Sequence, residues 1–497
     1  MKIVEDIEGN IKNLESVFEG CSDIVAKAFV LDRADRSVKI YVVYVDGLSD
    51  GGMVDEVLLK PLSYEWRGSF CRDIFNSIFY KELQTADVKR EKDFDSVLNA
   101  VLKGDTAVFV DGFCEAFIIA SKKLPVRGIG ENDSEAGMRG PKDSFTESLR
   151  QSTALIRRRI KDPKLKVIQD KIGERTATDY AMLYIEDLAE EKLVQELKDK
   201  LNRYRIDGIL DSGMAEQLME EGWRSPFPMF QSTARPDKVA AAVLEGRVAI
   251  VFDNSPEAVI APANINILFQ AADDYYNRWT VGSFARIIRY IAAFIALTLP
   301  GFYVAVTVYH SEMLPTKLLY AIAAARTMVT FPIIFEVVIM DFFFELLREA
   351  GIRLPGPLGN TIGVVGGLIV GQAAVDAGIV STIVVIVVAL TAISSFAIPN
   401  EVFASVFRLL KYFILLCSSL LGLYGFIIGL IAIVIHLSGL VSFGVPYLYP
   451  VAGRLKEDET DRDFFLRQPI LKMKYRPFWA KSDNRTRLSE RGNNVHK

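Results

Sequence analysis

Long stretches without charged side chains are the feature that most limits how this chain can fold. Residues 354–375 and 377–400 contain no Asp, Glu, Lys or Arg and are separated by Asp376 alone. Residues 290–309 and 412–453 are also free of charge. Because about 20 apolar residues let one helix cross the ~30 Å hydrocarbon core of a bilayer, we expect an integral membrane protein. The last run is long enough for one helix plus an interfacial segment, or for two helices.

The charges divide the chain into three parts. Residues 1–280 carry 38 basic and 48 acidic side chains, residues 281–453 carry 8 and 7, and residues 454–497 carry 12 and 7. The net charges of −10, +1 and +5 account for the total of −4. An acidic front argues against nonspecific binding of nucleic acid, which needs a cationic surface.

A faint internal repeat runs through the acidic front. KIYVVYVDGL at 39–48 matches DYAMLYIEDL at 179–188, and LKGDTAVFVDGFCEAFII at 102–119 matches LEGRVAIVFDNSPEAVI at 244–260, both at an offset near 140 residues. Each unit contains a buried-strand pattern, helical material and a strand–turn–strand. We therefore predict two α/β lobes, which either form a ligand-binding crevice or only dock against each other or a partner.

The predicted fold class is α+β combined with a polytopic α-helical membrane domain. The predicted domains are a first α/β lobe at 1–155, a second at 165–280, a helical transmembrane domain at 284–450 and a basic cytosolic tail at 451–497.

The residues needed for common enzymatic chemistry are missing from the front. The first histidine is His310, so the front has no Ser-His-Asp triad and no histidine-ligated metal, and neither GxxxxGK[ST] nor GxGxxG occurs. The cysteines, Cys21, Cys71, Cys114 and Cys417, are far apart. We predict no enzymatic activity, no cofactor and no metal site.

Three acidic residues lie in an otherwise apolar stretch of the membrane part. They are Glu336, Asp341 and Glu345. Carboxylates at membrane depth are costly and usually face water or the protein interior, so these are candidate pore-lining or other intramembrane polar residues. The alternatives are an amphipathic helix at the membrane surface, or simple pairing of the acids with Arg326 and Arg348 inside the bundle.

A stripe of small residues follows in the next apolar run. Gly363, Gly367 and Gly371 recur every four residues, a spacing that lets helices approach closely in lipid. We interpret them as helix-packing positions, with an oligomer contact as the more specific version.

The flanking charges predict the topology. The N-terminus lacks the apolar core of a signal peptide, and Arg286 and Arg289 precede the first apolar run. The tail is also basic, so we expect both termini in the cytosol and an even number of spans. Five candidate spans are apparent, which leaves four or six crossings open.

Four long motifs resemble one known family. They are PVRGIGENDSEAGMRGPKDSFTESLRQSTALIRRRIKDPKLKV at 125–167, SPFPMFQSTARPDKVAAAVLEGRVAIVFDNSPEAVIAPA at 225–263, ELLREAGIRLPGPLGNTIGVVGGLIVGQAAVDAGIVS at 345–381 and VSFGVPYLYP at 441–450. They resemble signatures of the A subunit of spore germination receptors, the GerA family. Ala234 and Thr327 stand where the family usually has Glu, which removes possible ion-pair partners of Arg235 and Arg326.

The resemblance implies a multi-pass receptor subunit in the inner membrane of a bacterial spore. Such a subunit works with a transporter-like B subunit and a lipoprotein C subunit. The complex of the three senses small nutrients, such as amino acids or sugars, and triggers ion release and germination. The family's A subunit is thought to oligomerise into a nutrient-gated ion channel, while the B subunit is the better candidate for nutrient binding. Two alternatives remain open, a secondary transporter of a small solute and a membrane-anchored scaffold.

Overall fold

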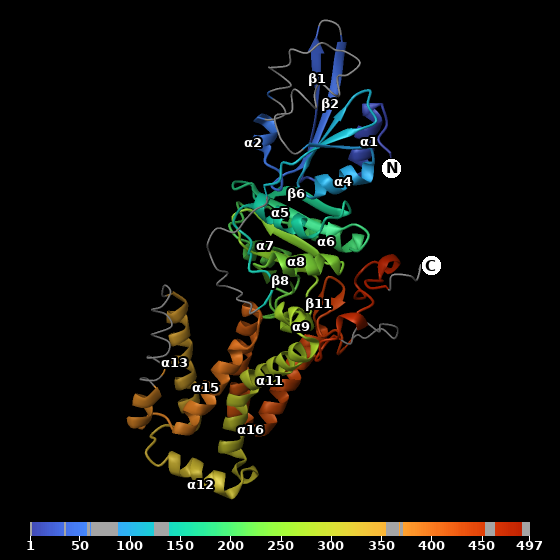
Figure 1. The fold of residues 1–497 in the computed structure, drawn as a ribbon. Helices are drawn as coiled ribbons and strands as arrows, with labels where there is room; N and C mark the ends of the chain where they lie inside the picture. Colours follow the sequence, from blue (N-terminus) through green and yellow to red (C-terminus); the bar gives the residue numbers. More distant parts are fainter. Residues whose placement is uncertain are drawn as a thin grey trace.

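The computed structural model describes most of the chain. The described residues are 2–33, 36–56, 60, 88–123, 139–353, 367, 371–452 and 463–489. Two sheet-containing lobes lie at one end of the molecule and a bundle of helices lies at the other (Figure 1). The C-terminal segment returns to the side of the second lobe.

Each lobe contains a five-stranded sheet with the same order of strands. The first order is β1-β2-β4-β5-β3 and the second is β6-β7-β9-β10-β8. The strands are β1 (Ile24–Arg33), β2 (Arg36–Val45), β3 (Val88–Glu91), β4 (Thr106–Val110), β5 (Ala116–Ile119), β6 (Leu165–Ile172), β7 (Thr178–Ile185), β8 (Gln231–Thr233), β9 (Val248–Phe252) and β10 (Ala258–Ala261). Every pairing between the described strands of both sheets is antiparallel, which is typical of α+β units.

The predicted repeat extends to single hydrogen bonds. The backbone N–H of Ile7 donates to the Asp111 carboxylate at 3.3 Å, and that of Leu149 donates to the Asp253 carboxylate at 3.0 Å. Asp111 directly follows β4 and Asp253 directly follows β9, the equivalent strand of the second lobe. Each carboxylate accepts a hydrogen bond from the N–H of the first residue of a helix. Because such unpaired N–H groups need an acceptor, the same capping solution appears in both lobes.

Helices cover the sheets. The helices found among the described residues of the front are α1 (Ile7–Val17), α2 (Gly51–Val54), α4 (Phe94–Leu102), α5 (Leu149–Arg159), α6 (Glu191–Leu201), α7 (Ser212–Met219), α8 (Pro236–Leu244), α9 (Ile265–Phe269) and α10 (Asp273–Tyr276). In the second lobe, α5 and α8 share a core with one face of the sheet, and α6 and α7 share a core with the other.

The lobes dock directly through a buried ion pair. Arg157 Nε and Nη2 each donate to Asp23 at 2.8 Å, and the two side chains are 0% and 3% exposed. Beside them, Cys21 forms a parallel β-bridge with Val167. A bidentate pair of this kind fixes orientation as well as distance, so it sets the angle between the lobes.

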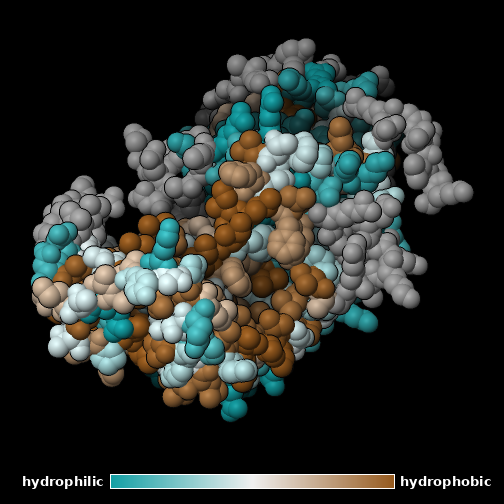
Figure 2. Space-filling model, turned by 90° about the horizontal axis from the view of Figure 1, so that it is seen from below, coloured by the Kyte–Doolittle hydropathy of each residue, from teal (hydrophilic) through white to brown (hydrophobic). Residues whose placement is uncertain are grey.

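Among the residues that the structure describes, the helical part contains five helices of ten or more residues. They are α11 (Trp279–Val304), which continues as a π-helical turn (Ala305–Tyr309), α12 (Thr316–Ala325), α13 (Ile333–Arg353), α15 (Thr382–Phe396) and α16 (Glu401–Gly439). Within the described residues, two segments are long and apolar enough to cross a membrane, Trp279–Tyr309 and Glu401–Gly439. Most of the predicted span at 354–375 lies outside the described residues. Seen from below, apolar side chains dominate the surface of this part (Figure 2).

The α16 segment is a helical hairpin. Gly422 has φ 59° and ψ −136°, which breaks the helical path. A Cβ added to Gly429 would lie 3.5 Å from Cys417 Cβ, although residues twelve apart in a straight helix are about 18 Å apart. The chain therefore reverses at Gly422 into two antiparallel arms, and the two-helix alternative for 412–453 is the one found.

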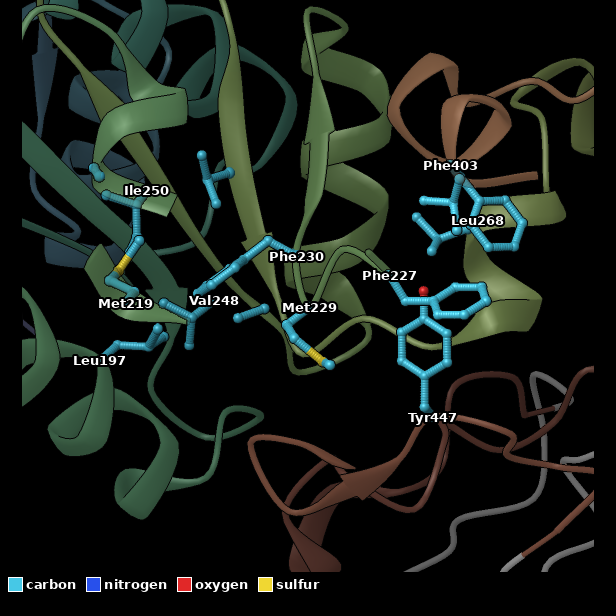
Figure 3. Packing of buried hydrophobic residues seen from close by; sticks show 14 of the residues in the cluster. Leu197, Met219, Phe227, Met229, Phe230, Val248, Ile250, Leu268, Phe403 and Tyr447 are labelled. Carbon is cyan, nitrogen blue, oxygen red and sulfur yellow. The ribbon is translucent and has the colours of Figure 1, made fainter. Parts of the chain in front are cut away.

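Both ends of this hairpin reach the second lobe. The Phe227 ring lies 6.4 Å from the ring of Phe403 in the first arm and 6.0 Å from that of His436 in the second. Tyr447, in the segment after the second arm, also contacts Phe227 (Figure 3). The core of the second lobe thus continues into the ends of the two arms of α16.

Candidate functional site

A buried lysine holds two of the predicted acids. Lys411, in the first arm of α16, donates to Asp341 Oδ1 at 2.7 Å and to Glu345 Oε1 at 3.0 Å, both on α13. The Lys411 and Asp341 side chains are only 6% and 4% exposed. The acids lie one helical turn apart, so one ammonium group reaches both. In this arrangement, the charge of the two carboxylates is partly neutralised inside the bundle.

Glu336 has a different role. Its carboxylate lies 3.2 Å from Arg326 Nε and accepts the backbone N–H of Ser381 at 2.9 Å. Ser381 is the N-cap of α15, so this fully buried acid stabilises the positive end of that helix. The pairing of Arg326 with an acid, one of the alternatives considered above, is therefore found for Glu336.

Arg348 does not pair with these acids as that alternative proposed. Its guanidinium instead lies 3.8 Å from Glu401 and 5.4 Å from the ring centroid of Phe396. Arg408 approaches Glu345 at 3.5 Å. Arg235, the other arginine beside a family departure, binds the Asp237 carboxylate at 2.9 Å. Both arginines that lack the family's Glu thus have an acidic partner elsewhere.

A cavity of about 340 Å³ lies beside the Lys411 cluster, between α11, α13, α15 and α16. Its walls include several apolar residues of α13 and α15. They also include the charged residues of the Lys411 cluster, which are Asp341, Glu345, Arg348, Arg408 and Lys411. Charged groups of the helical part therefore border open space at this cavity.

The glycine stripe is only partly described. Gly363 lies outside the described residues. A Cβ at Gly367 would meet nothing within 4 Å, and one at Gly371 would be 3.8 Å from Val385 of α15. A close approach of two helices at a glycine is found instead between α11 and α16. There, a Cβ added to Gly301 of α11 would lie 2.7 Å from the Ile414 side chain of α16.

A second charged cluster joins the soluble part to the helices. Arg289 of α11 binds both carboxylate oxygens of Asp274 at 2.7 Å, and Arg286 binds Asp463 of the C-terminal segment at 2.8 Å. The Tyr275 hydroxyl donates to the same Asp463 at 2.5 Å. Burial, and then the Asp463 carboxylate, raise the pKa of Tyr275 well above its usual value, so it stays protonated as a donor.

The C-terminal segment completes this junction. Ala480 forms a β-bridge with Ala189 of the second lobe, and Lys481 Nζ donates to the carbonyl of Glu186 at 2.7 Å. Asp463 also lines a second cavity, of about 310 Å³, between this segment and the lobe. The tail is therefore structurally part of the second lobe.

One titratable group of the second lobe has an unusual proton affinity. Burial, and then the neighbouring Glu220, raise the pKa of Glu216 in α7 to about 7. The Ser232 hydroxyl donates to its carboxylate at 3.1 Å. Within the described ranges, no three His, Cys, Asp or Glu side chains come together in a way that could hold a metal ion.

Comparison with known proteins gives the family. The model of the Bacillus/Clostridium GerA spore germination proteins matches residues 12–479. This chain belongs to the GerA family. The resemblance found in the four motifs is thereby confirmed over nearly the whole chain.

Individual relatives agree with this assignment. The chain is 41% identical over 443 residues to spore germination protein KA of Bacillus subtilis (strain 168), which covers 89% of this chain and 81% of that protein. It is 39% identical over 475 residues to the uncharacterized membrane protein YfkQ of the same organism, covering 96% and 91% of the two chains. A crystal structure of the N-terminal domain of the A subunit of the Bacillus megaterium spore germinant receptor GerK3 is 29% identical, with a TM-score of 0.42 and coverage of 53% of this chain and 97% of that one.

Sequence reasoning identified the three acids but missed Lys411, Arg408 and the junction residues Asp274 and Asp463. Lys411 directly precedes the charge-free run at 412–453. Its position beside an apolar segment could have indicated that it pairs with the acids of the other apolar stretch. Asp463 carried no comparable signal, because its partner Arg286 is 177 residues away in the chain.

Proposed function

We propose that this chain is the membrane subunit of a spore nutrient (germinant) receptor that triggers germination, and that it oligomerises to form a nutrient-gated ion channel. Family membership and relatives named as spore germination proteins support the receptor role. The observation that carries the channel role is the pair of carboxylates, Asp341 and Glu345, tied to Lys411 at a cavity within the helical bundle. A passive anchor has no need of such costly groups.

The proposed gate is the contact between α13 and α16. While Lys411 holds both carboxylates, their charge is not available to a passing cation. A shift of α13 relative to α16 separates the ammonium from the acids and gives the opened path two negative charges. Such a two-state bundle responds to any ligand that favours the open arrangement.

The proposed route to the gate runs through α11. Its first turns are held by Asp274 and Asp463, and its later turns pack on the first arm of α16 through Gly301. A movement of the second lobe or tail is therefore transmitted to the helix that carries Lys411.

The proposed partners are those of the family. A transporter-like B subunit binds the nutrient, a lipoprotein C subunit completes the receptor, and further copies of this chain complete the channel. The chain itself acts as a receptor subunit in the spore inner membrane and not as an enzyme.

The proposed topology is six spans with both termini in the cytosol. Support comes from the tail packed on the second lobe and from the two arms of α16, which return the chain to its starting side. Counting α11, α13, the apolar sequence run at 354–375, α15 and the two arms gives an even number. Cysteine labelling from each side of the membrane tests this, and opposite labelling of residues 2 and 489 would contradict it.

Ion flux tests the channel. The chain and its partner subunits are reconstituted in liposomes, and nutrient-dependent cation release is measured. Asp341→Asn and Glu345→Gln should change cation selectivity, whereas Glu349→Gln, on the same helix but paired at the surface with Arg353, should not. Absence of nutrient-dependent release with all subunits present would contradict a channel, and uptake of labelled solute by the chain alone would favour a transporter instead.

A further inference from the structure

The cavity beside Lys411 contains more positive than negative charge. Its walls carry three cationic side chains, Arg348, Arg408 and Lys411, and two carboxylates, Asp341 and Glu345. Lys411 and Arg408 already share both acids. The carboxylate nearest Arg348 belongs to Glu401, which is 3.8 Å away and 75% exposed. One positive charge in the cavity is therefore poorly compensated.

The two arginines are largely removed from solvent. The side chains of Arg348 and Arg408 are only 16% and 19% exposed. Arg408 Nε is buried and has no hydrogen-bond acceptor among the described residues. A buried cation without a full partner is strongly destabilising, and more so within a bilayer, where water cannot replace the missing acceptor. The arrangement calls for an anion with several oxygen acceptors.

The remaining wall is apolar and open to the outside of the bundle. Leu347 of α13 lines it, together with Ile393 and Phe396 of α15. The last two side chains are each 66% exposed, so the cavity opens on the surface that faces lipid. A ligand that fits must combine an anionic oxygen-rich group with a hydrocarbon chain.

We propose that this cavity binds the phosphate group of an anionic membrane lipid. The phosphate oxygens accept from Arg348 and the free Nε–H of Arg408, and an acyl chain lies against Leu347, Ile393 and Phe396. The cavity is at the lobe-facing end of the helices, because Arg348 is in the last turns of α13 and Arg408 in the second turn of α16. Basic pockets between membrane helices on this side of a membrane are known to receive anionic headgroups.

Native mass spectrometry of the full chain tests the proposal. The protein is reconstituted in phosphatidylcholine vesicles that contain phosphatidylglycerol, extracted in mild detergent, and examined for retained lipid. We expect preferential retention of phosphatidylglycerol. Arg348→Gln/Arg408→Gln should lower it about ten-fold, because charge-assisted bonds to phosphate are lost.

Three comparisons keep the test specific. Arg353→Gln removes an arginine from the same helix that is 78% exposed and paired with Glu349, and should leave retention unchanged. The Arg348→Lys/Arg408→Lys variant keeps the charge and should retain most of the lipid, which separates binding from misfolding. Inorganic phosphate added to the extracted protein should not displace the lipid, because it has no chain for the apolar wall.

Equal retention of the two lipids, or displacement by inorganic phosphate, would overturn the lipid assignment. No ion flux is measured here, so failure of this proposal is distinguishable from failure of the proposed channel.

Discussion

Pairs of buried and partly buried charged side chains fix the geometry of this protein at several internal contacts, three of which join its main parts. Arg157 and Asp23 join the lobes, Arg289 and Asp274 join the second lobe to α11, and Lys411 with Asp341 joins α16 to α13. Removing one member of such a pair leaves the other buried and unpaired, which is costly even where the intact pair contributes little. Asp341 could be singled out from the sequence because carboxylates are rare in an apolar stretch of this kind. Its partner could not, since Lys411 is 70 residues from Asp341.

Replacing Lys411 should destabilise the chain by more than the intact ion pair contributes to its stability. Lys411→Met leaves the Asp341 and Glu345 carboxylates without their shared ammonium, and we expect a loss of about 3–5 kcal/mol. The measurement is the thermal unfolding midpoint of the full chain in detergent. Adding Asp341→Asn to Lys411→Met should recover part of the loss, and Glu349→Gln should have little effect. A Lys411→Met chain as stable as the unmodified one would show that the pair is not formed.

Glu216 should make stability fall as the pH rises. Its pKa is raised to about 7, above the ordinary value of 4.5. The folded chain therefore holds a proton on Glu216 between these values that the unfolded chain has lost, and stability decreases with pH through this window. Glu216→Gln should flatten the dependence and raise stability at pH 8 by up to about 3 kcal/mol. Unfolding midpoints between pH 5 and 8 test this, and parallel profiles for the two chains would contradict it.

Among the secondary-structure elements, α16 does most to shape the helical part. Its reversal at Gly422 turns one apolar segment into two antiparallel arms whose ends both lie against Phe227. The length of the apolar run was consistent with one helix or two. What decides between them is packing of the second arm on Ile414 and Cys417, and the crowding of Gly422 by Tyr309. Contacts of this kind depend on neighbouring helices, so the position of the turn was not predictable from the run alone.

Gly422→Ala should destabilise the hairpin. The φ of 59° with ψ of −136° is one that only glycine adopts easily, and the added Cβ would lie 2.8 Å from Tyr309 Cβ. We expect a cost of about 1–3 kcal/mol for the backbone conformation, with the clash in addition. Gly439→Ala, at the end of the same segment, is the control because its Cβ would meet nothing within 4 Å. Equal unfolding midpoints for the two variants would contradict the hairpin.

At the scale of the whole molecule, two folded parts are joined by one continuous core and closed by the tail. The duplicated lobes could be predicted because the repeat of strand patterns, at an offset near 140 residues, survives in the sequence. The return of the tail could not, because Lys481 contacts a carbonyl 295 residues earlier. A basic composition predicts a charged segment but not the surface that receives it.

Asp463→Asn should loosen the tail. The substitution removes the charge that Arg286 and Tyr275 contact, while the Arg286 side chain remains 0% exposed. We expect amide hydrogen exchange to accelerate across residues 463–489 and in the first turns of α11, because local opening becomes less costly. Lys472→Gln, an exposed change in the same segment, should leave exchange unaltered. Exchange that is unchanged in Asp463→Asn would show that this contact does not hold the tail.

The position of Asp463 also bears on how the protein is made. The ribosome synthesises Arg286 177 residues before Asp463, the carboxylate that it contacts. Ala189 of the second lobe is made earlier still relative to Ala480, its partner in the tail. Both lobes and the helices can therefore form before the junction closes, because closure needs residues 463 and 480. A chain that stopped before residue 463 would keep Asp274 beside the start of α11 but lack the second carboxylate that Arg286 contacts, so one carboxylate would hold the junction in place of two.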